Sequence, residues 1–82
     1  MNKLLISEYI SRLTKENIYS FGIKQGITMQ SNDLDIIYYY IKNKYQEFFN
    51  NPDIILKEIK PQITNQAYDI IINLYNKYKY LM

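Results

Sequence analysis

Apolar residues recur three and four positions apart along most of the chain, which is the spacing of one face of an α-helix. In the first helix this stripe consists of Leu4, Leu5, Tyr9 and Leu13. The short stretch 27–29 alternates apolar and polar residues instead, as an extended segment does. The pattern predicts five helices: one near the N-terminus, followed by residues 15–25, 31–45, 52–60 and 65–80.

Two threonines and one glycine mark where these helices begin and end. Thr14 and Thr64 each follow an apolar residue and precede another at the fourth helical position, which is typical of an N-cap with a hydrophobic staple. Gly26 suits the left-handed position just beyond a helix end. Gly22 lies inside the second helix, where it lowers helix propensity but permits the close approach of another segment.

The starts of the third and fourth helices are marked by polar residues. Ser31 is the expected cap of the third helix, with Asp33 in its first turn, and Thr28 is the alternative cap. The fourth helix begins at Asn51-Pro52-Asp53, because proline is favoured at the first helical position. Pro61 ends it, because a proline pushes the preceding residue away from helical geometry.

Three consecutive tyrosines lie in the third helix. At 100° per residue, Tyr38 belongs to the apolar stripe and is expected in the core, whereas Tyr39 and Tyr40 lie about 140° and 120° to either side of it. The three rings therefore cannot form one stacking platform. Ile36, Tyr39 and Tyr40 instead give this helix a second apolar face, which either another part of the chain or a partner must cover.

The composition favours one small helical domain spanning residues 1–82. The chain has 82 residues, of which 48% are hydrophobic and 22% charged, and its formal net charge is +2. This is enough apolar surface for a core, and together with the helical pattern it predicts an all-α bundle of about five helices with short loops.

Catalytic chemistry finds little support in the residues. The chain has no His and no Cys, which removes the commonest general base and the common transition-metal ligands. Asp33 and Asp35 form the closest acidic pair, but on a helix they point in different directions. Arg12 could clamp an anion, although pairing with Glu8 four residues earlier is the favoured interpretation. We therefore expect a protein that is not an enzyme, with no catalytic residue, cofactor, metal site or small-molecule substrate.

A cytoplasmic protein is the default interpretation of this inventory. Cysteine is absent, and a short helical chain without disulfides is more typical of the cytosol than of secretion. Glu8 and Arg12 interrupt the apolar N-terminal stretch before a signal-peptide core could form. No segment approaches the length of a membrane span, so we expect no membrane partner.

The C-terminal stretch YNKYKYLM interleaves lysines with rings. Its residues Lys77, Tyr78, Lys79 and Tyr80 follow the last acidic residue, Asp69. Lysines beside aromatic rings are what single-stranded nucleic-acid binders use for phosphate attraction and base stacking. The alternative is structural, because lysines in the last turn complement the helix dipole and Tyr78 continues the apolar stripe.

The chain also resembles a family of short helical proteins of low-GC Gram-positive bacteria, one of the domain-of-unknown-function families. The similarity extends over nearly the whole chain and consists of capping and packing motifs: Leu13-Thr14 with Glu16, Gly26-Ile27, Tyr40-Ile41-Lys42, Phe49, Ile59, Ile63-Thr64 and Ala67. The resemblance implies a small helical bacterial cytoplasmic protein without an assigned activity or functional residues.

Two functions follow from these patterns. The first is a protein-interaction or self-associating module that uses Ile36, Tyr39 and Tyr40. The alternative is a nucleic-acid-binding module that uses Lys77, Tyr78, Lys79 and Tyr80. For the alternative, the order of helix, extended GITMQ link and helix is similar to modules of SAP type, some of which bind DNA, but the link here has no basic residue.

Overall fold

The computed structural model describes the backbone of residues 3–81 and the side chains of residues 5–80. It confirms the all-α fold, because within residues 3–81 there are five α-helices and no strand. The helices are α1 (Lys3–Arg12), α2 (Lys15–Lys24), α3 (Ser31–Asn50), α4 (Pro52–Ile59) and α5 (Asn65–Tyr78). Two short 3-10 turns follow α4 and α5, at Lys60–Gln62 and Lys79–Leu81.

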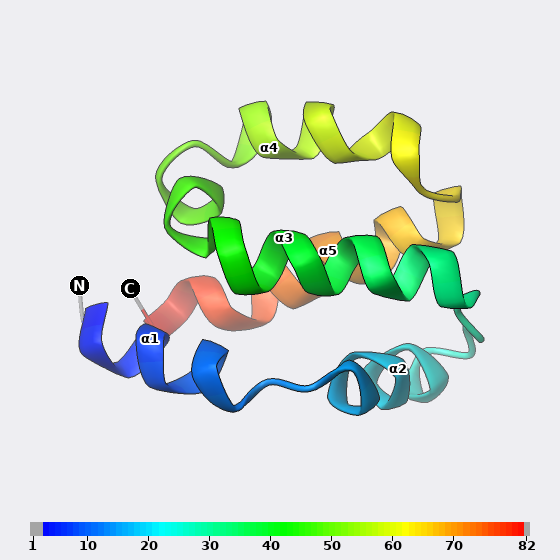
Figure 1. Cartoon of the computed structure of the whole chain (residues 1–82), viewed down its shortest axis with the longest axis horizontal. Coiled ribbons are helices and arrows are strands. Elements are labelled where there is room, and N and C mark those ends of the chain that lie inside the picture. The colour runs from blue at the N-terminus through cyan, green and yellow to red at the C-terminus, as the bar shows by residue number, and fades with distance from the viewer. Residues whose placement is uncertain (1–2, 82) are drawn as a thin grey trace.

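The long helix α3 organises the bundle, since it contacts each of the other four helices. In Figure 1, α4 runs along one side of α3, α1 and α2 lie along the opposite side, and α5 lies behind it. Five isoleucines at the centre are almost fully buried: Ile18 of α2, Ile37 of α3, Ile59 of α4, and Ile70 and Ile71 of α5. Every helix except α1 thus contributes to the innermost layer of the core.

The predicted caps of α2 and α5 are confirmed. Thr14 Oγ1 accepts a hydrogen bond from the Asn17 amide at 3.1 Å, and Asn17 Oδ1 accepts one from the Thr14 amide at 3.0 Å. Thr64 Oγ1 accepts one from the Ala67 amide at 3.3 Å. After α2 the backbone turns at Gly26, which has a φ of +79°. The sequence could predict these caps and this turn because each depends on residues within one helical turn.

The glycine inside α2 serves the close approach that its position suggested. A methyl group at Gly22 would lie 3.1 Å from the Ile27 carbonyl oxygen and 3.5 Å from Ile70 Cδ1 of α5. The link after α2 therefore folds back directly over its last turn. Ile27 and Met29 face inward and Thr28 and Gln30 outward, as the alternation predicted.

The predicted boundaries of α3 were wrong at both ends. Gln30, not Ser31 or Thr28, occupies the N-cap position, and it makes no capping hydrogen bond through its side chain. At the other end α3 continues past Tyr45 to Asn50, with an irregular backbone at Lys44 (φ −130°, ψ 22°). The predicted end of the helix thus lies next to this kink, where the helix changes direction without stopping.

The expected apolar stripe of the first helix was right at Leu13 and wrong at Tyr9. Its buried side chains are Ile6 and Ile10, with Leu13 just beyond the helix, whereas Tyr9 is 49% exposed. The side chain of Leu4 lies outside the described residues. The buried stripe shares Leu13 with the predicted one and otherwise runs through Ile6 and Ile10, because packing against α3 selects that side of α1.

Candidate functional site

The predicted interface on α3 retains one exposed ring of its three residues. Tyr39 is 53% exposed, Ile36 is half-buried, and Tyr40 is only 5% exposed. Of the two possibilities that the sequence left open for this face, Tyr40 is covered by another part of the chain. Helix α4 covers this side of α3. Glu58 of α4, and Gln62 just beyond it, both form hydrogen bonds with the Tyr40 hydroxyl.

These contacts form a polar network between α3 and α4. The Tyr40 hydroxyl donates to Glu58 Oε1 and accepts from Gln62 Nε2, both at 2.9 Å. Lys44 Nζ lies 3.4 Å from the same Glu58 oxygen. Burial raises the pKa of Tyr40, and the hydrogen bond from Tyr40, followed by that from Lys44, lowers the pKa of Glu58. The network keeps Tyr40 as a neutral, inward-facing group, unsuited to contact with a partner.

Tyr38, expected in the core, lies only half-buried at the junction of α3 with α1 and α2. The ammonium groups of Lys15 and Lys42 lie 5.5 and 5.6 Å from its ring centre. Lys42 also donates to the carbonyl of Ile10 at 2.7 Å, at the end of α1. Both ammonium groups thus lie over the Tyr38 ring within the range of a cation–π interaction.

A groove between α1, α2 and α5 gathers a different set of side chains. It has a volume of about 400 Å³ and opens to solvent. Three aromatic rings line it, those of Tyr9, Phe21 and Tyr78, and the rings of Tyr9 and Tyr78 lie 6.1 Å apart. Burial is the main cause of the raised pKa of Tyr78, and electrostatic repulsion from Tyr9 raises this pKa further. The remaining lining residues are Arg12, Leu13, Asn17, Ser20, Lys24, Leu74 and Lys77. We call this space the basic groove, because three of these residues are positively charged.

The charge of the basic groove is of one sign. Arg12, Lys24 and Lys77 line it, and none of its ten lining residues is acidic. Arg12 is not paired with Glu8, contrary to the favoured interpretation, because the ion pairs among the described residues are Lys15–Asp35 and Lys44–Glu58. Three cations without a carboxylate among the lining residues create a positive potential that attracts anions.

Lys77 links the charge of the groove to its rings. Its ammonium lies 5.3 Å from the centre of the Phe21 ring and 5.6 Å from that of Tyr78. Of the four C-terminal candidates, Lys77 and Tyr78 line the groove, whereas Lys79 and Tyr80 do not. Lys79 lies over the Tyr80 ring, and that ring is 82% exposed.

Sequence reasoning missed the part of this groove that α1 and α2 supply. A signal was present in α2, where Asn17, Ser20, Phe21 and Lys24 follow the i, i+3, i+4, i+7 spacing of one helix face without an acid. Nothing local showed that this face would meet the end of α5. A hydrogen bond from Asn73 Nδ2 to Gln25 Oε1 joins the two helices beside the groove.

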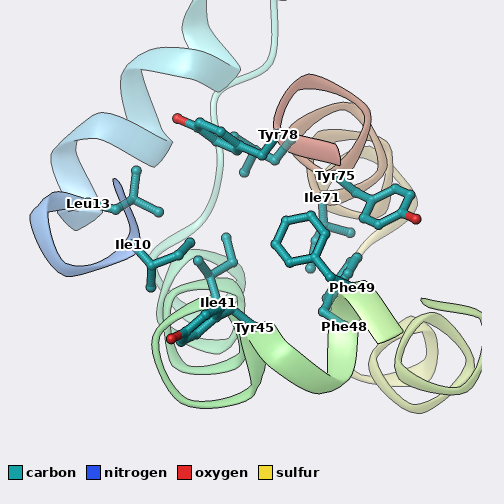
Figure 2. Close-up of a pocket in the computed structure, with 10 residues that line it drawn as sticks. Ile10, Leu13, Ile41, Tyr45, Phe48, Phe49, Ile71, Tyr75 and Tyr78 are labelled. Carbon is teal, nitrogen blue, oxygen red and sulfur yellow. The ribbon is translucent and has the colours of Figure 1, made fainter. Parts of the chain in front are cut away.

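A second space, the apolar hollow, lies between α1, α3 and α5. Figure 2 shows its lining side chains, which leave a small space of about 30 Å³ between them that opens to solvent. On one side Tyr75 packs against Phe48 and Phe49, with ring centres 5.3 and 5.6 Å apart. The lining set is Ile10, Leu13, Ile41, Tyr45, Phe48, Phe49, Ile71, Leu74, Tyr75 and Tyr78.

Comparisons with known proteins do not suggest a function for this chain. No protein-family model matches the chain, and searches of curated proteins and of solved structures find no significant match. Of the helices within residues 3–81, none has both the length and the apolar character needed to cross a bilayer. The same residues contain no cluster of three or more side chains suited to hold a metal ion.

Proposed function

We propose that this protein binds single-stranded nucleic acid in the basic groove. The observation that carries the proposal is the joint presence of three cations and three rings in one groove whose lining has no acid. Phosphates would lie against Arg12, Lys24 and Lys77, and unpaired bases would stack on Tyr9, which is 49% exposed. Lysine or arginine with aromatic platforms is how proteins hold single strands without reading their sequence.

Single strands are favoured over duplexes because rings can stack only on bases that are not already paired. With about 0.7 counterions released per neutralised phosphate, three cations give a slope of log K against log salt concentration of roughly −2. The test is fluorescence anisotropy of a labelled oligothymidylate, at low salt and over a salt series. We expect binding that weakens with this slope, and weaker binding of a duplex of the same length.

The matched variants are Lys77→Gln and Lys60→Gln. Lys60 is also an exposed lysine over a ring, 5.3 Å from the centre of Tyr68, but it lies outside the basic groove. We expect Lys77→Gln to weaken oligonucleotide binding severalfold and to reduce the salt slope, and Lys60→Gln to leave both near wild type. Equal effects of the two variants, or no binding at low salt, would refute the proposal.

A second candidate is self-association through the exposed face of α3, which the 53% exposure of Tyr39 beside half-buried Ile36 favours. Light scattering after gel filtration tests it, with Tyr39→Lys as the disrupting variant. Tyr19→Lys is the matched control, since Tyr19 of α2 is 37% exposed on another helix. A dimer that Tyr39→Lys alone dissociates supports this candidate, and a wild-type monomer at high concentration rejects it.

We also propose a bacterial cytoplasmic setting for either function. Its support is the absence of cysteine and the resemblance to the low-GC Gram-positive family described above, which stays a prediction.

A further inference from the structure

The lining of the basic groove contains one side-chain amide, that of Asn17. Asn17 is exposed and lies in the first turn of α2. Its Oδ1 accepts a hydrogen bond from the Thr14 amide at 3.0 Å, as one half of the capping box. Only the oxygen of the side chain can accept from that N–H, so this hydrogen bond fixes which way the amide is turned. The capping of α2 therefore decides which atom of Asn17 is left for a ligand.

The atom that is left is Nδ2, which can donate two hydrogen bonds and accept none. Within the part of the chain that the structure describes, it makes no hydrogen bond. The other polar side chains of the groove are its three cations and the hydroxyls of Tyr9, Ser20 and Tyr78. Cations suit phosphate oxygens, whereas a neutral amide can distinguish the donors and acceptors on the edges of bases. Asn17 is thus the lining residue best suited to select a base.

We propose that Asn17 gives the groove a preference for the keto bases uracil, thymine and guanine over the amino bases cytosine and adenine. Nδ2 donates to O4 of uracil or thymine, or to O6 of guanine, in a base that stacks on Tyr9. Cytosine and adenine carry the N4 and N6 amino groups there, and an amino group is a donor that opposes Nδ2. The inference rests on the proposed function and adds a base preference to it.

The capping box also argues against the usual pairing of asparagine with adenine. That pairing is bidentate, because the asparagine amide donates to N7 and its oxygen accepts from the N6 amino group. In this chain Oδ1 of Asn17 is engaged by the Thr14 amide, so the side chain presents its donor alone. A donor alone favours a base edge with an accessible carbonyl oxygen.

Oligodeoxyuridylate and oligodeoxycytidylate of equal length provide the test. Their bases have the same ring size and differ at the edge that Asn17 contacts. Fluorescence anisotropy at low salt measures both affinities. We expect oligodeoxyuridylate to bind roughly two- to tenfold more tightly, which is the net effect of one hydrogen bond. Equal affinities would overturn this inference and leave the proposed function standing, whereas no binding of either oligonucleotide would refute both.

The variant that tests the role of Asn17 is Asn17→Asp, which replaces Nδ2 with a second oxygen. A carboxylate oxygen can still accept the Thr14 amide, and an acid in the first turn complements the helix dipole, so the cap is kept. The added negative charge weakens the binding of both oligonucleotides. The carboxylate, however, accepts from the cytosine amino group and repels O4 of uracil. We expect the ratio of the two affinities to reverse in favour of oligodeoxycytidylate.

Lys24→Gln is the matched control, because it changes the charge of the groove by the same amount and leaves the Asn17 amide intact. Lys24 lines the groove from the same face of α2, two helical turns further along. We expect this variant to lower both affinities severalfold and to keep the preference for oligodeoxyuridylate. A preference that survives Asn17→Asp, or that Lys24→Gln abolishes, would overturn the assignment of base selection to Asn17.

Discussion

Thr64 makes hydrogen bonds that join separate parts of the chain. Its hydroxyl oxygen accepts the Ala67 amide and so caps α5, and the same hydroxyl donates to Asp33 Oδ2 at 2.7 Å. The Thr64 amide also donates to Asp33 Oδ1 at 3.3 Å. Asp33 is 4% exposed, so its carboxylate depends on these two donors in place of water. The start of α5 is thereby fixed to the first turn of α3.

Replacing Thr64 should therefore cost more than replacing the other threonine cap. Thr14→Ala removes a cap at the exposed start of α2, which typically costs roughly 0.5–2 kcal/mol of unfolding free energy. Thr64→Ala removes a cap and also a hydrogen bond to a buried carboxylate, which adds roughly 1–3 kcal/mol. Urea denaturation of both variants measures the difference. Equal losses would show that Asp33 contributes nothing through Thr64.

The Tyr40 network gives stability a defined pH window. The Glu58 pKa is lowered from its ordinary value of 4.5, so its contribution is present above pH 4.5 and is lost as the pH falls through the folded value. The Tyr40 pKa is raised from 10.0, so its contribution is present below pH 10.0 and is lost as the pH rises through the folded value. The network is intact between these limits.

The corresponding variant is Tyr40→Phe, which removes the hydroxyl from the network. We expect wild type to be more stable than Tyr40→Phe by a constant margin near neutral pH, and the margin to shrink at both extremes. Denaturation midpoints measured across the pH range provide the test. A margin that does not vary with pH would mean that the hydroxyl contributes without Glu58.

At the scale of elements, close packing requires a glycine at position 22, although glycine disfavours a helix. Alanine favours a helix over glycine by about 1 kcal/mol, so Gly22→Ala should stabilise α2 in isolation. In the folded chain the added methyl group would lie 3.1 Å from the Ile27 carbonyl, a backbone atom with little freedom to move. We expect Gly22→Ala to lower the thermal midpoint of unfolding. A higher midpoint would show that the link yields without cost.

The sequence predicts the features that depend on neighbouring residues, but not those that depend on residues far away in the chain. The caps Thr14 and Thr64 and the turn at Gly26 depend on neighbours within four residues, and all three were predicted. Asp33 lies in the first turn of α3 as predicted, but its hydrogen bonds to Thr64 were not predicted, because Thr64 lies 31 residues away. Tyr40 was placed on a flank because helical spacing shows which residues share a face but not which face α4 will cover. The same limit explains why Tyr9 was expected in the apolar stripe of α1 and Ile6 and Ile10 were not.

At the scale of the whole molecule, the basic groove combines residues that the sequence places far apart. Lys77 and Tyr78 were candidates from their own neighbourhood, because lysines and rings alternate there. Arg12 and Lys24 could not be assigned to the same site, since only the packing of α1 and α2 beside α5 brings them together (Figure 1). The groove rather than the tyrosine run of α3 is therefore the main candidate for function.

The most direct test of this account maps where a single strand binds. Amide chemical shifts recorded during titration with an oligothymidylate report contact along the whole backbone without altering the protein. We predict the largest changes at Asn17, Ser20 and Lys24 of α2 and at Lys77 and Tyr78 of α5, with little change around Tyr39. Changes centred on α3 and α4, or confined to the residues after Tyr78, would contradict the assignment of the basic groove.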